Sequence, residues 1–143
     1  MTKPKYIIDA TLHLFGDALE PGRISELLGV KPSRSWRKGD KLFRSEALRK
    51  HGHWAVTVAT EPDRLDLPSV IDRLVARVGP KWETAKTLPG VTKTRVSFYI
   101  SFDPEAHGQM AISFELSEQN IEALKTIGGE VRFTVDRSSP EEP

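Results

Sequence analysis

Apolar and polar residues alternate along several stretches of the chain, and a two-residue period is typical of strands with one buried side. The first stretch, KYIIDATLHLF, spans residues 5–15 and places Ile8, Leu12 and Leu14 on one side. Four more follow: HWAVTVAT at 53–60, KTRVSFYISF at 93–102, MAISFEL at 110–116 and EVRFTVD at 130–136. The turn-rich link 103–109 predicts that the third and fourth of these strands form an antiparallel hairpin or meander.

Between the strands, apolar residues recur at helical spacing. Residues 20–29 predict a short helix that has Pro21 in its first turn and ends at Gly29. Residues 66–80 predict the clearest helix, because Val70, Ile71 and Leu74 form one apolar stripe. A last helix is expected to begin after Ser117, a good N-cap residue, and to end at the glycines 128–129.

Each predicted strand is apolar on one side, which favours one sheet with all helices on the same face. The order of elements predicts an α+β two-layer sandwich, with one mostly antiparallel sheet, ferredoxin-like with an added helix. Residues 1–137 are expected to form a single domain and residues 138–143 a disordered tail. The opposite face of the sheet is expected to carry Thr11, His13, Thr57, Arg95, Ser97, Tyr99, Ser113 and Arg132.

The composition narrows the class of protein. The 143 residues include no cysteine, which excludes disulfides, thiolate metal sites and cysteine nucleophiles. No apolar run approaches the roughly 20 residues that span a bilayer, and the N-terminus lacks the apolar stretch of a secretory signal. We therefore expect a cytoplasmic protein with no membrane partner.

Positive charge is concentrated in one part of the chain. Residues 31–54 contain eight Lys and Arg and two acidic residues, a net charge of +6, so the rest of the +1 chain carries −5. We interpret this segment as a basic loop of a non-enzymatic binding domain that engages an acidic protein or a small anion. The candidate partner-binding residues are Arg34, Trp36, Arg37, Lys38 and Lys41.

Other interpretations of the basic segment stay open. Its cations can pair with carboxylates of the same molecule while Trp36 seals the core. Lys and Arg beside an aromatic side chain can also bind nucleic acid, but the net negative remainder would repel an extended polyanion, so this is the less favoured alternative. The open sheet face offers one good stacking aromatic, Tyr99, and its hydroxyls favour water or the sheet of a second copy in a homodimer.

Motifs for catalysis or metal binding are weak. His51 and His53 are spaced as two zinc ligands on a strand can be, but a third ligand from His13 or His107 would depend on the fold. Ser25, His13 and Asp9 could form a hydrolytic triad only if the fold brought them together, and no nucleophile elbow surrounds Ser25. We expect no metal, no cofactor and no catalytic residue, and an enzyme of unrecognised mechanism is the remaining alternative.

Several fragments, in this order, resemble a family of small, mostly bacterial proteins known as domain of unknown function 4279. They are LEPGRISELLGVKPSRSWRKGD at 19–40, Trp54 at the start of its strand, and FELSEQNIEALKTIGGEVRFTVD at 114–136. The most specific part combines Ile24-Ser25, Leu28-Gly29, Pro32 and Lys38-Gly39-Asp40 with the later tryptophan. The resemblance covers residues 6–136 and implies a compact α+β domain, with no known reaction, cofactor or catalytic residue.

Overall fold

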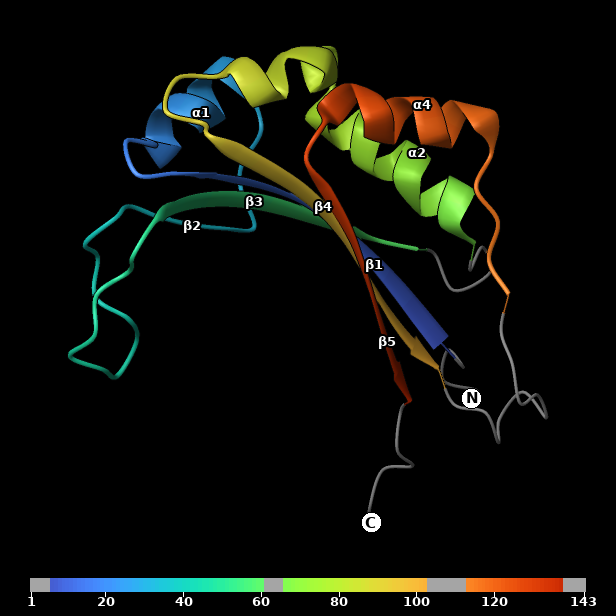
Figure 1. The fold of residues 1–143 in the computed structure, drawn as a ribbon, viewed down its shortest axis with the longest axis horizontal. Coiled ribbons are helices and arrows are strands. Elements are labelled where there is room, and N and C mark those ends of the chain that lie inside the picture. Colours follow the sequence, from blue (N-terminus) through green and yellow to red (C-terminus); the bar gives the residue numbers. More distant parts are fainter. Residues whose placement is uncertain (1–5, 61–65, 103–112, 138–143) are drawn as a thin grey trace.

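A computed structural model describes residues 6–60, 66–102 and 113–137 of the chain (Figure 1). Its elements are β1 (Tyr6–Gly16), α1 (Pro21–Leu28), β2 (Arg34–Trp36), β3 (Gly52–Ala59), α2 (Leu67–Val78), the 3-10 helix η1 (Trp82–Thr87), β4 (Lys93–Phe102), α4 (Glu118–Ile127) and β5 (Glu130–Arg137).

The strands form one five-stranded sheet in the order β2-β3-β1-β4-β5. β1 lies at its centre and runs antiparallel to both β3 and β4, and β2 pairs antiparallel with β3 at one edge. β5 pairs parallel with β4 at the other edge, and α4 connects the two. The predicted α+β class and mostly antiparallel sheet are therefore confirmed, whereas this strand order does not confirm the ferredoxin-like detail.

The helices cover one face of the sheet, as the sequence predicted (Figure 1). Side chains of β1, β3 and β4 on that face have almost no exposed surface and pack against α1, α2, η1 and α4. The largest fully buried side chains of the core include Trp54, Phe98, Leu12 and Leu14 from the strands and Ile71 from α2. The opposite face has no helix over it among the described elements.

Local signals place the helix ends where the sequence predicted them. The side chain of Asp66 accepts a hydrogen bond from the backbone N–H of Ser69 at the start of α2. Ser117 and Asn120 form a reciprocal capping box at the start of α4. Gly29, with a φ of 68°, ends α1 in the left-handed conformation that glycine adopts at low cost.

The predicted strand 110–116 is wrong in its described part. Residues 113–116 lie in no strand, and β4 has β1 and β5 as its neighbours instead of a hairpin partner. Phe114 and Leu116 are half-buried against the core, so their alternation with polar residues reflects alternate burial without a hydrogen-bonded ladder. Residues 103–112 and the predicted disordered tail 138–143 lie outside the described residues.

The sequence analysis also missed β2, which lies inside the segment interpreted as a basic loop. Its three residues pair with residues 53–55 of β3 and extend the sheet by one short edge strand. Among the described residues, no helix has the length and apolar character needed to cross a membrane.

Candidate anion-binding site

The open face of the sheet gathers polar side chains from all five strands. Because β1 is central, its outward residues stand beside outward residues of both neighbouring strands: Thr11 lies opposite Thr57 and Ser97, and His13 lies opposite Ala55 and Arg95. β5 adds Arg132 beside Ser97, and β2 adds Arg34 beside Ala55. Of the outward residues predicted from sequence, all but Ser113 lie on this face; Ser113 belongs to the segment outside the sheet.

Hydrogen bonds between side chains join the strands across this face. The hydroxyl groups of Thr11 and Thr57 are 2.8 Å apart. The Nε2 atom of His13 lies 2.8 Å from the Ser97 hydroxyl, and its Nδ1 atom lies 2.9 Å from Nε2 of His53. Both histidines are buried, and Nδ1 of His53 has no hydrogen-bond partner among the described residues.

Three arginines from three strands line a hollow of about 530 Å³ on this face. Arg34 comes from β2, Arg95 from β4 and Arg132 from β5. The side chain of Arg95 is 17% exposed and donates to Glu130 across 3.1 Å. In the described part of the chain, Arg34 and Arg132 form no ion pair and no side-chain hydrogen bond. The hollow therefore contains guanidinium groups with free donors.

Acidic groups are fewer than basic groups in the hollow. Asp9 is the one carboxylate among its described lining residues, against the three arginines, and burial raises the pKa of Asp9 above its usual value. Asp136 stands at the edge, where it accepts a hydrogen bond from the Tyr99 hydroxyl at 2.6 Å. This hydrogen bond raises the pKa of Tyr99, so the phenol stays protonated. The balance of charge in the hollow is positive.

Burial and the neighbouring arginines keep the two histidines neutral. Burial lowers the pKa of His13 to about 3, and the charges of His53, Arg34, Arg95 and Arg132 act in the same direction. Burial, with Arg34, Arg49 and Arg95, lowers the pKa of His53 to about 4. A general base works best with a pKa near the operating pH, so His13 is a poor base for activating Ser97 at neutral pH. Ser97, His13 and His53 are hydrogen-bonded in a row, as in a proton relay. Because the pKa values of both histidines are low, we interpret this row as a neutral hydrogen-bond network.

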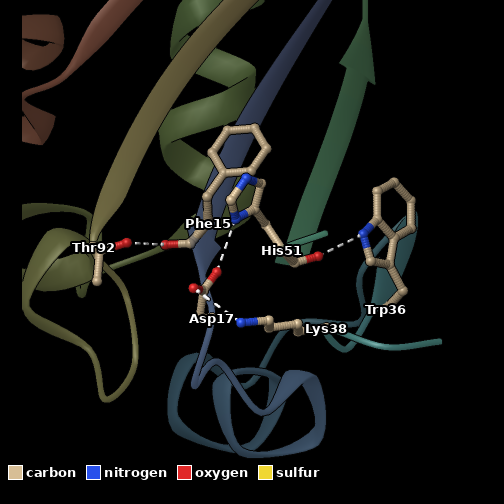
Figure 2. Close-up of polar contacts among 6 residues, drawn as sticks. All are labelled: Phe15, Asp17, Trp36, Lys38, His51 and Thr92. Atoms are coloured by element: carbon tan, nitrogen blue, oxygen red, sulfur yellow. Dashed lines mark hydrogen bonds and ion pairs between the residues drawn. The ribbon is translucent and has the colours of Figure 1, made fainter. Parts of the chain in front are cut away.

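A second, apolar hollow of 330 Å³ lies beside the first. An aromatic row forms one of its walls: the rings of Phe15 and His53 stack at 4.8 Å, and Trp36 lies 4.5 Å from His53. The Arg49 guanidinium covers the Trp36 ring at 3.8 Å. Figure 2 shows the indole N–H of Trp36 donating to the backbone oxygen of His51, a bond of 3.1 Å. Trp36 is half-buried on the open face and does not seal the helix-covered core.

The structure separates the residues that the sequence grouped as a partner-binding loop. Arg34 faces the large hollow, whereas Arg37 pairs with Glu20 at 2.8 Å, Lys38 with Asp17 at 3.4 Å and Lys41 with Glu46 at 4.0 Å. Figure 2 shows Lys38 and His51 both directed at the carboxylate of Asp17. These pairs are exposed, so each contributes little to stability, but each partly neutralises a loop cation.

The other candidate groupings do not assemble. Ser25 lies on α1 and accepts a hydrogen bond from Trp54, on the helix-covered side, while His13 and Asp9 lie on the open face. His51 is exposed and bonds to Asp17, whereas His53 is buried beside His13. Within the described ranges, no group of three His, Cys, Asp or Glu residues could hold a metal ion.

Sequence reasoning found most of the open face but missed that Arg34 joins it. The signal was present in the alternation Arg34-Ser35-Trp36, which places the arginine and the tryptophan on one face of a short strand. Three residues are too few for periodicity to stand out, and the neighbouring turn formers favoured a loop.

Comparison with known proteins gives a family. The family model described as "Domain of unknown function (DUF4279)" matches residues 4–137 of the 143-residue chain. The chain belongs to this family. No curated protein and no solved structure matches it. The DUF4279 match includes every residue that lines the two hollows.

Proposed function

We propose that this DUF4279 protein is a non-enzymatic binding domain that takes a small anion on the open face of its sheet. The observation that carries the proposal is the meeting of Arg34, Arg95 and Arg132 at one hollow, although they come from three different strands. The three guanidinium groups repel one another, and an anion bound between them would attract each of them and offset this repulsion. The proposal includes a cytoplasmic location, which the lack of cysteine supports.

The chemistry of the lining suits a carboxylate or a phosphate. A guanidinium group presents a planar fork of N–H donors that matches two oxygens of either anion. The hydroxyl groups of Thr11, Thr57 and Ser97 stand between the arginines and add neutral hydrogen-bonding groups. Binding is favoured over catalysis because His13, the base nearest to a hydroxyl, has its pKa lowered to about 3.

A small anion is favoured over an acidic protein or a nucleic acid. The arginines line a hollow, which admits a compact ligand more readily than a flat or convex surface. Arg37, Lys38 and Lys41 are partly neutralised by their own carboxylates, and the chain outside the basic segment carries −5. An acidic protein that docks on the loop is the alternative, and it would depend on these three residues instead of Arg132. A homodimer through the open face stays a prediction, and it would bring two arginine clusters together.

Isothermal titration with inorganic phosphate and with malonate, at low ionic strength, tests the proposal. Arg34→Gln and Arg132→Gln each remove a charge-assisted hydrogen bond of about 1.5–3 kcal/mol, so the dissociation constant should rise about tenfold or more. Arg37→Gln is the matched control, because it removes the same charge three residues from Arg34 and should change affinity less than twofold.

Three results would count against the proposal. Equal losses for Arg34→Gln and Arg37→Gln would place the binding site on the loop. Absence of binding for every anion, with the variants folded as judged by circular dichroism, would remove the small-anion function altogether. Filter retention of an oligonucleotide by the wild-type protein, with steep salt dependence, would favour the nucleic-acid alternative.

A further inference from the structure

We infer that the ligand is an amphipathic anion, whose charged group binds the three arginines while an attached apolar group fills the neighbouring hollow beside Trp36. This inference rests on the proposed function and adds the chemical class of the ligand. It is carried by the second hollow and by how closely that hollow adjoins the first.

The second hollow is apolar, unlike the first. Its 330 Å³ are lined by Phe15 and Trp36 from the sheet and by Leu42, Ala47 and Leu48 from the loop between β2 and β3. A backbone bridge between Lys41 and Leu48 holds the two arms of this loop together. Leu48 keeps 55% of its surface exposed although it lines the hollow. An apolar group placed here would remove this surface from water, which is favourable by about 25 cal/mol per Å².

Two pairs of neighbouring residues connect the hollows. Arg34 and Trp36 stand two positions apart on β2 and on the same face, a separation of about 7 Å, and one lines each hollow. His13 lines the polar hollow and His53 the apolar one, and their rings are joined by the 2.9 Å contact. A ligand with its anionic and apolar groups about 7 Å apart would therefore reach both sites at once.

The aromatic wall of the apolar hollow is held by contacts within the protein itself. Trp36 is held between His53 and the Arg49 guanidinium, and its indole N–H is bonded to the backbone of His51. Phe15 is half-buried and stacks on His53 from the other side. A site whose aromatic wall is already ordered loses less entropy on binding, which favours affinity. Arg49 and Lys50 at the rim add positive charge, so the apolar group must belong to an anion or a neutral molecule.

The test compares methyl phosphate with 1-naphthyl phosphate, which carry the same charged group with a small or a large apolar substituent. The naphthyl ester should bind at least tenfold more tightly to the wild-type protein. Leu48→Ser should reduce this ratio threefold or more, and Ala47→Phe, which fills the hollow, should abolish it. The matched control is Ile121→Ser on α4, since Ile121 is 53% exposed, close to the 55% of Leu48, but lies in the helical layer. Arg132→Gln should weaken both esters by the same factor.

The outcomes separate this inference from the proposed function. Binding of both esters with equal affinity would overturn the amphipathic ligand and leave the small-anion function intact. A naphthyl preference that survives both Leu48→Ser and Ala47→Phe would also overturn it, because the apolar group would lie elsewhere. A preference that is lost equally in Ile121→Ser would contradict it as well. If neither ester binds, both proposals fail.

Discussion

His13 on β1 and His53 on β3 share a hydrogen bond of 2.9 Å in which one neutral ring donates to the other. The bond closes a chain that begins at the Ser97 hydroxyl and ends at Nδ1 of His53, which has no partner within the described ranges. Because the rings lie beside Arg34 and Arg95, protonation of either histidine would add charge to a region that is already positive. Burial and these charges both oppose protonation, so the folded protein favours the pair with both rings uncharged.

Lowering the pH should destabilise the fold through this pair. The folded-state pKa values, about 3 for His13 and about 4 for His53, are below the unfolded value of 6.5. From about pH 6.5 downward the unfolded chain binds more protons than the folded one, so the free energy of unfolding falls as the pH falls. The fall should continue until the folded-state values are reached. Urea denaturation at pH 7.0, 6.0 and 5.0 measures the slope.

The variant His53→Gln tests the assignment of this slope. The variant should be less stable at pH 7 because it loses the ring-to-ring hydrogen bond to His13. Its stability should fall less steeply between pH 6.5 and 5, because one of the two histidines with a lowered pKa is gone. Two carboxylates also lie on this face: burial raises the pKa of Asp9, and hydrogen bonds from Lys93 and Arg95 lower the pKa of Glu130. Both remain in His53→Gln, so the difference in slope between this variant and the wild type reports the histidine. His51→Gln, which removes an exposed histidine, is the control and should keep most of the wild-type slope. An unchanged slope in His53→Gln would contradict the assignment.

A second prediction concerns Gly90, in the turn before β4. Its φ is 81°, and an added Cβ would lie 2.7 Å from the backbone oxygen of Ala18 and 2.8 Å from Cα of Leu19. Backbone atoms cannot rotate away as a side chain can, so Gly90→Ala should cost about 2 kcal/mol or more. Gly22→Ala is the control: in the first turn of α1 nothing lies within 4 Å of the added atom, and stability should be unchanged or rise by up to about 1 kcal/mol. Thermal unfolding of both variants checks this, and equal midpoints would contradict it.

The sequence predicted the layers better than the neighbours of each strand. Alternation along 5–15 and 93–102 correctly separated core residues such as Leu12 and Phe98 from outward ones such as Thr11 and Ser97, because burial on one side leaves that mark on any strand. The parallel pairing of β4 with β5 has no corresponding pattern in the sequence. Residues 110–116 alternate as regularly as β4 does, but the described part, 113–116, packs on the core without joining the sheet.

Only part of the candidate site could be predicted from the sequence, again because the pairing of distant strands leaves no local pattern. Charge counting found the basic segment, but could not tell that Arg34 turns toward the sheet while Arg37 pairs with Glu20. The partners of Arg34 in the hollow are Arg95 and Arg132, some 60 and 100 residues away along the chain. These arginines come together because of the order of the strands in the sheet. The pattern of residues within one strand does not reveal which strands are its neighbours.

A last prediction concerns Trp54, which is fully buried and donates its indole N–H to the Ser25 hydroxyl at 3.0 Å. Ser25→Ala leaves a buried donor without its partner and should destabilise the fold by about 1–3 kcal/mol. Trp54→Phe removes the donor, so adding Ser25→Ala to that variant should cost less than in the wild type, and a double-mutant cycle from urea denaturation measures the difference. Ser35→Ala, at an exposed position on β2, should change stability by less than about 0.5 kcal/mol. If the losses in the two single variants simply add in the double variant, the hydrogen bond between Ser25 and Trp54 contributes nothing to stability. Each residue would then stabilise the fold through its other contacts.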